Sequence, residues 1–169
     1  MKNTIVIKYK KSAVAKRMQI IPFGKFAEAI PYIKENSISL DDAILSGRNF
    51  YDVDFSGMSL KRVDFSESSF HNCKFDNADC SEANFTACRF DECMCRSTLF
   101  RLADLSYAGM WDTICSCANF DQTDLFESAF IATSLLHADF TSARNIVTTV
   151  FDNLIEAKLP ENFVPLIAQ

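Results

Sequence analysis

The sequence is poor in the residues that interrupt regular structure. It has four Gly and four Pro among 169 residues, while 49% of its residues are hydrophobic. So few chain-breaking residues exclude a disordered or linker-rich chain. At this length, the apolar content is enough to close the core of one domain.

Signals for membranes, secretion and catalysis are also missing. No apolar run reaches the length of a transmembrane helix, and no basic start is followed by an apolar segment like that of a signal peptide. The sequence has neither a Gly-rich phosphate loop nor an H-E-x-x-H pattern. We therefore expect a soluble, cytoplasmic protein that is not an enzyme, has no cofactor and does not contact a membrane.

What the sequence does contain is a repeat with a period of five. Every fifth residue from Leu45 to Phe140 is a large apolar residue or a cysteine, without a break in register. Most of these residues are preceded, two positions earlier, by a smaller residue such as Ala83 before Phe85. A helix repeats near 3.6 and a half-buried strand at 2, so the pattern fits neither. Internal repetition therefore determines the fold.

Four of these units resemble the A-(D/N)-(L/F)-x-x unit of pentapeptide repeat proteins: Ala83-Asn84-Phe85, Ala103-Asp104-Leu105, Ala118-Asn119-Phe120 and Ala138-Asp139-Phe140. The resemblance implies an all-β fold, a right-handed quadrilateral β-helix with four pentapeptides per coil and both apolar positions facing the axis. Positions 45–144 would then form about five coils and, at the ~4.8 Å spacing of paired strands, a rod roughly 24 Å long.

Three segments are expected along the chain. Residues 1–40 form a basic N-terminal segment or cap, 41–144 the β-helix, and 145–169 a C-terminal cap or dimerisation tail. An uncapped last coil would leave strand edges open, which solenoids avoid. The resemblance implies a homodimer formed through the C-terminal end. Within the first segment we predict a strand over 4–9 and a short helix over 25–35 that Pro31 limits or kinks.

The repeat register places six of the seven cysteines inside: Cys73, Cys80, Cys88, Cys93, Cys95 and Cys115. Residues twenty apart should lie one above the other, which places Cys73 near Cys93 and Cys95 near Cys115. A thiolate metal site is one interpretation, but the C-x-C spacing lacks the open turn of zinc sites. We favour reduced core thiols without a metal, which suit a reducing compartment.

Charge is distributed unevenly. Residues 1–40 carry eight Lys or Arg against two Glu, whereas 41–169 carry nine against twenty acidic residues. One side of the predicted rod, formed by 43–47 and the segments 20, 40, 60 and 80 residues later, has carboxylates and no Lys or Arg. We call this the acidic side and predict that its carboxylates bind a partner: Asp64, Glu67, Asp104, Asp124 and Glu127.

The resemblance adds a function to this charge, because the family includes rod-shaped mimics of duplex DNA that occupy the DNA-binding channel of enzymes such as DNA gyrase. A 24 Å stretch of B-DNA holds about 14 charges, comparable to the net −9 of residues 41–144. We therefore predict a non-catalytic acidic DNA mimic that inhibits or protects a DNA-binding enzyme or complex, gyrase or a defence nuclease. Its partner is a protein, and direct nucleic-acid binding is not expected.

Other readings of the surface stay open. Acidic residues also keep a β-rod soluble and discourage edge pairing. Alternatively, the protein is an interaction scaffold or a secreted effector that binds through the N-terminal segment or through an apolar patch. The residues of this predicted patch, which could also form a dimer contact, are Trp111, Ile114, Ile131 and Leu136. Five basic residues near the N-terminus form either a solvated cap or a binding arm: Lys8, Lys10, Lys11, Lys16 and Arg17.

Overall fold

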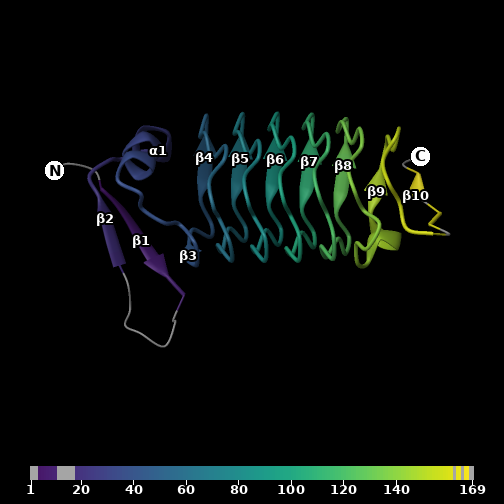
Figure 1. Ribbon diagram of the computed structural model, residues 1–169, viewed down its shortest axis with the longest axis horizontal. Helices are drawn as coiled ribbons and strands as arrows, with labels where there is room; N and C mark the ends of the chain where they lie inside the picture. Colours follow the sequence, from purple (N-terminus) through teal and green to yellow (C-terminus); the bar gives the residue numbers. More distant parts are fainter. Residues whose placement is uncertain (1–3, 11–17, 162, 165, 168–169) are drawn as a thin grey trace.

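The computed structural model describes residues 4–10, 18–161, 163–164 and 166–167. Its centre is a β-helical rod of about five turns whose coils stack along the long axis of the molecule (Figure 1). The N-terminal segment, which contains a helix and two antiparallel strands, covers one end of the rod (Figure 1). The C-terminal tail lies at the other end (Figure 1). The predicted pentapeptide β-helix is confirmed.

One side of the rod is a parallel sheet with one short strand from each coil. Its strands are β4(Asn49–Tyr51), β5(Ser69–His71), β6(Arg89–Asp91), β7(Gly109–Trp111) and β8(Ala129–Ile131), followed by β9(Val150–Phe151) and β10(Leu166–Ile167). Neighbouring coils of β4–β8 pair twenty residues apart, as in Phe70 with Phe90. The other sides are joined by single parallel bridges with the same offset.

The inward positions of the repeat fill the axis with stacked aromatic rings. The Phe50 and Phe70 ring centroids are 5.0 Å apart, and those of Phe70 and Phe90 are 4.7 Å apart, in stacked geometry. These separations match the coil spacing of ~4.8 Å, so each ring packs on its equivalent in the next coil. Burying each ring contributes on the order of 1.5–3 kcal/mol. The large residues at every fifth position, many of them Phe, therefore set the register and contribute much of the stability.

Each corner of the coil uses one residue with a left-handed backbone. Gly47 and Gly57 have φ of 65° and 67°, but most corner positions hold other residues, such as Glu67 at 59° and Tyr107 at 61°. This conformation is costly for a residue with a Cβ. Regular inter-coil hydrogen bonds offset that cost, as when Glu67 N donates to Thr86 O at 2.9 Å.

The N-terminal segment packs on the first coil. The predicted strand and helix are confirmed as β1(Ile5–Tyr9) and α1(Phe26–Glu35), and α1 continues through Pro31. Strand β1 pairs with β2(Met18–Ile21) on one edge and with β3(Ala43–Ile44) on the other. Phe26 of α1 lies edge-on against Phe50, at 5.0 Å between centroids. Of the predicted basic residues, Lys11, Lys16 and Arg17 lie outside the described residues.

The C-terminal tail extends the solenoid by a further, irregular turn. After the 3-10 helix η1(Ile146–Thr148), β9 pairs with β8, and Phe151 stacks on Phe130 at 5.2 Å. The pairing offset is 21 residues at Phe130 with Phe151 but 19 at Asp139 with Lys158. The intervening side of this turn is therefore two residues shorter than in the coils before it. The shortening leaves a hollow on that side, described below.

Candidate acidic binding side

The structure gathers the five predicted acidic residues on one side of the rod. Asp64, Asp104 and Asp124 stand in one column of parallel bridges, with Asn84 between the first two. Glu67 and Glu127 occupy the left-handed corner of their coils and are exposed. Asp104 and Asp124 are one coil apart, a separation of ~4.8 Å along the axis. The column therefore places the like charges of Asp104 and Asp124 in adjacent coils, with Asp64 two coils from Asp104.

Local hydrogen bonds fix the aspartates of this column. One carboxylate oxygen of each aspartate accepts from the backbone N–H two residues later: Ser66 at 3.1 Å, Ser106 at 2.9 Å and Phe126 at 3.1 Å. This is the Asx-turn geometry, in which a short polar side chain satisfies a turn. The aspartates are consequently half-buried and held in one orientation, rather than free to search for a partner.

The acidic side differs from the other three in how its charge is balanced. On those sides, several carboxylates pair with a basic residue one coil away: Asp42 with Arg62 at 2.8 Å, Asp76 with Arg96 at 3.0 Å and Asp121 with Arg101 at 3.0 Å. Among the described residues, the acidic side has one ion pair, Asp124 with Arg144 at 3.7 Å. Asp64, Glu67, Asp104 and Glu127 have no ion-pair partner within that part of the chain.

Arg144 also lies on the acidic side, although the sequence analysis did not assign it there. It continues the column of Asp124 by one coil, as the bridge between the two residues shows. Position 144 is twenty residues after Asp124, so the repeat register predicts this placement. Its guanidinium limits the unpaired charge at the C-terminal end of the acidic side.

On the other sides of the rod, hydrogen bonds and ion pairs lower the pKa of two aspartates. The hydrogen bond from the Arg62 guanidinium, reinforced by its charge, lowers the pKa of Asp42 below its ordinary value. The Ser56 hydrogen bonds lower the pKa of Asp54 in the same direction. Both aspartates therefore remain ionised to lower pH in the folded protein than in the unfolded chain.

The structure distributes the predicted apolar patch over three columns. Trp111 and Ile131 are paired neighbours in β7 and β8, and both are half-buried. Ile114 is half-buried in the column of Met94 and Ser134, whereas Leu136 is 41% exposed at the next position toward the corner. The patch therefore presents less apolar surface than outward positions alone predict.

Gly109 and Arg89 contact the indole of Trp111 and cover part of it. The indole lies over Gly109, where an added Cβ would stand 1.8 Å from a ring atom. The Arg89 guanidinium lies 4.8 Å from the ring centroid, in cation–π contact, and pairs with Asp91 at 2.6 Å. A side chain at position 109 would displace the indole, so glycine allows this close approach.

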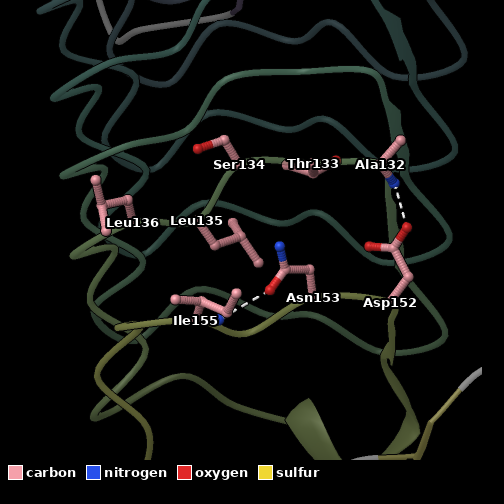
Figure 2. A pocket seen from close by; sticks show the side chains of 8 residues that line it. All are labelled: Ala132, Thr133, Ser134, Leu135, Leu136, Asp152, Asn153 and Ile155. Carbon is pink, nitrogen blue, oxygen red and sulfur yellow. Dashed lines mark hydrogen bonds between the residues drawn. The ribbon is translucent and has the colours of Figure 1, made fainter.

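The shortened last turn leaves an open hollow of about 550 Å³. Figure 2 shows its lining, which consists of Ala132, Thr133, Ser134, Leu135, Leu136, Asp152, Asn153 and Ile155. The Asp152 carboxylate accepts a hydrogen bond from Ala132 N, and Asn153 Oδ1 accepts from Ile155 N at 3.0 Å (Figure 2). These polar groups are thus engaged in closing the turn.

Within the described part of the chain, the two histidines do not lie together with other catalytic or metal-binding residues. His71 and His137 are both exposed; His71 lies near Tyr51, and His137 lies 3.5 Å from Glu156. In the described ranges, no group of three or more His, Cys, Asp or Glu side chains could hold a metal ion. The same part of the chain contains no helix that is both long and apolar enough to cross a membrane.

Comparison with known proteins connects the fold to a family. A family model described as the SV2A/B/C luminal domain matches residues 28–119, more than half of the chain. No curated protein matches. Similar solved structures include a pentapeptide repeat protein from the Arabidopsis thaliana thylakoid lumen, 24% identical over 59% of this chain and 69% of that chain, with a TM-score of 0.38.

Two further solved structures are similar to this chain. A pentapeptide repeat protein from Nostoc PCC 7120 is 17% identical over 80% of this chain and 95% of its own, with a TM-score of 0.44. Full-length QnrB1, a plasmid-mediated fluoroquinolone resistance protein, is 20% identical over 73% of this chain and 75% of its own, with a TM-score of 0.35.

The expected cytoplasmic location is corrected by these findings. It rested on the lack of export signals and on the free cysteines, whereas the matching family model describes a luminal domain and so points away from the cytoplasm. Buried cysteines pack as small apolar residues in any compartment, so their presence did not identify a reducing one. The repeat, the parallel β-helix and the family match agree: this chain is a pentapeptide repeat protein and belongs to the family of the SV2A/B/C luminal domain.

Proposed function

We propose that this protein is a non-catalytic binding protein whose acidic side docks on a positively charged surface of a partner protein. In its sharper form, the proposal is that the rod mimics the charge of duplex DNA and occupies the Lys- and Arg-lined surface of a DNA-binding enzyme or complex. The carboxylates of the acidic side that would make this contact are Asp64, Glu67, Asp104, Asp124 and Glu127.

The unbalanced charge of this side is the observation that supports the proposal. Four of its five carboxylates have no ion-pair partner among the described residues, while Asp42, Asp76 and Asp121 elsewhere on the rod are paired. Repulsion between stacked like charges lowers the stability of a sheet. A partner that supplies Lys or Arg would remove that repulsion on binding.

The geometry also suits long-range attraction. The column of Asp64, Asp104 and Asp124 follows the rod axis, with Glu67 and Glu127 beside it at the corner. A linear field of one sign steers an oppositely charged surface and accelerates association. The carboxylates are already oriented by turn hydrogen bonds, so little side-chain freedom is lost on binding.

A second candidate function is self-association through the C-terminal end. Large apolar side chains are exposed in the last turn, among them Val147 at 64%, Ile155 at 68% and Val164 at 79%. Apolar surface of this kind is typical of protein interfaces. A homodimer formed there would lie at the C-terminal end of the acidic side, where Glu127 N donates to Thr148 Oγ1 at 2.9 Å.

The proposed function is tested by affinity capture from lysate with three forms of the full chain. The first is native. The second has its acidic side neutralised with isosteric amides: Asp64→Asn, Glu67→Gln, Asp104→Asn, Asp124→Asn and Glu127→Gln. The third removes five charges from the other sides: Asp52→Asn, Asp54→Asn, Glu82→Gln, Glu92→Gln and Asp112→Asn.

We expect the native chain and the third form to capture the same basic or DNA-handling proteins and the second form to lose them. The amides preserve the turns, because Asn84 already accepts from Thr86 N at 3.0 Å in the same column. Equal capture by all three forms would contradict binding through the acidic side.

Sedimentation of a Val147→Asp, Ile155→Asp variant tests the dimer separately, with a shift from dimer to monomer as the expected result.

A further inference from the structure

Two buried cysteines lie one above the other in neighbouring coils. Lys74 and Met94 form a parallel bridge, and Met94 N donates to Cys73 O at 2.9 Å, which sets Cys73 and Cys93 one coil apart. Paired strands are ~4.8 Å apart, within the Cα separation of about 4.4–6.8 Å that disulfides span. Both thiols are free in this structure and buried.

The two side chains have matching surroundings. Cys73 Sγ lies 3.5 Å from Phe50 O and 3.5 Å from His71 O. Cys93 Sγ lies 3.5 Å from Phe70 O and 3.3 Å from Asp91 O, the equivalent carbonyls one coil later. Both sulfurs therefore lie beside equivalent carbonyls of successive coils and occupy equivalent places in the core.

A second stacked pair, Cys95 and Cys115, serves as an internal comparison. Cys115 Sγ lies 3.6 Å from Met110 Sδ, a contact within its own coil. In both pairs, contact between the two thiols and burial raise the pKa of one member above its ordinary value, Cys95 in the second pair and Cys93 in the first. The Cys115 thiol contacts Met110 within its own coil, whereas the sulfurs of Cys73 and Cys93 have matching contacts one coil apart.

We propose that Cys73 and Cys93 form a disulfide that links two neighbouring coils when the chain folds in the presence of a small-molecule disulfide. The Cys73 thiolate attacks one sulfur of oxidised glutathione and releases one glutathione thiolate, leaving a mixed disulfide. Cys93 then loses its proton and attacks the Cys73 sulfur. This step forms the Cys73–Cys93 bond and releases the second glutathione thiolate, so two protein thiols are oxidised and one glutathione disulfide is reduced.

The first exchange takes place while the coil is open. In the closed rod both sulfurs are buried, and a glutathione adduct has no room among the core side chains. Coils add to a solenoid one after another, so the pair is accessible before the neighbouring coils close over it. The match to a luminal domain also removes the argument that these thiols are kept reduced.

The test uses the full chain refolded with oxidised glutathione, then denatured, alkylated without reduction and digested with trypsin. Cleavage places Cys73 in peptide 63–74, Cys80 and Cys88 in 75–89, and Cys93 with Cys95 in 90–96. We expect peptides 63–74 and 90–96 to be linked and Cys80 and Cys88 to carry the alkyl group. Full alkylation of all these cysteines, or a linkage that does not include Cys73, would overturn the proposal.

Two variants that suit their columns complete the experiment. Cys93→Thr follows Thr113 and Thr133 in the same column, and Cys88→Ala follows Ala108 in its own. The linkage should disappear in Cys93→Thr and persist in Cys88→Ala. A reductant should lower the Tm of the oxidised native chain by roughly 5 °C or more, and leave that of Cys93→Thr unchanged. Persistence of the linkage in Cys93→Thr would assign the bond to Cys95 and overturn the proposal.

Discussion

The acidic side and the strand side formed by β4–β8 are built on the same repeat but use their outward residues differently. On the strand side Arg89 pairs with Asp91 and covers Trp111, whose indole lies over Gly109. On the acidic side the carboxylates stand one above another, and only Asp124 has an ion-pair partner among the described residues. Since the inward Phe rings hold the coils in both cases, outward residues can serve function without changing the fold.

The strand side should be the more sensitive of the two to a single added methyl group. Gly109→Ala places a Cβ where the Trp111 ring now lies, so we expect a loss of about 1–3 kcal/mol in the free energy of unfolding. Urea denaturation measures the loss, and Trp111 emission should shift to the red as the indole becomes exposed. Ser69→Ala, at the same position in β5, is the control and should leave both unchanged. An unaltered emission in Gly109→Ala would show that the ring does not depend on glycine.

At Asp104 on the acidic side, two substitutions separate the effect of the turn hydrogen bond from the effect of the negative charge. Asp104→Ala removes the acceptor for Ser106 N and should cost about 1 kcal/mol of stability. Asp104→Asn retains an acceptor and removes the repulsion with Asp124, so its stability should equal or exceed that of the native chain. Thermal denaturation of the two variants provides the comparison. Equal destabilisation by both would mean that the charge itself supports the fold.

Ion pairs on the other sides should contribute little to stability although they balance charge. Arg96→Ala leaves Asp76 without its partner at 3.0 Å, but both side chains are partly exposed. Such pairs are worth about 0–1 kcal/mol, and salt screens them. We expect a change of a few tenths of a kcal/mol in urea denaturation, shrinking further in high salt. A loss as large as that of Gly109→Ala would contradict this picture.

Acid should weaken the paired sides through their lowered pKa values. Asp42 has a pKa below its ordinary value of 3.8 in the folded chain, so its contribution is present above 3.8 and is lost as the pH falls through the folded value. In Asp42→Asn the decline in stability below pH 4 should be shallower than in the native chain. Denaturation midpoints measured between pH 2 and 6 test this, and identical slopes would contradict it.

The period of five was sufficient to predict the architecture. It fixed which residues face the axis, and therefore which residues share a column, because a β-helix with twenty residues per coil converts sequence spacing directly into stacking. The predicted column of Asp64, Asp104 and Asp124 is present for this reason. The stacking of Cys73 with Cys93 follows from the same register.

The period of five did not predict features that depend on side-chain packing. Position 111 is outward by register, yet the Trp111 indole folds back over Gly109. The sequence signal for this packing was Gly109, because the other positions of its column hold residues with side chains. The two-residue shortening of the last turn lies where the repeat ends, so no register predicted it or its hollow. The left-handed backbone at the corners was not predicted either, because most corner positions hold residues other than glycine.

The most direct test of the central claim is the association rate constant of a captured partner, measured against ionic strength for the native chain and for the two five-charge variants. If the acidic side provides the binding surface, the native chain and the variant altered on the other sides should associate much more slowly as salt rises. The variant neutralised at Asp64, Glu67, Asp104, Asp124 and Glu127 should be slow and nearly insensitive to salt. Equal rates and equal salt dependence for the two variants would show that only net charge matters and would contradict the account.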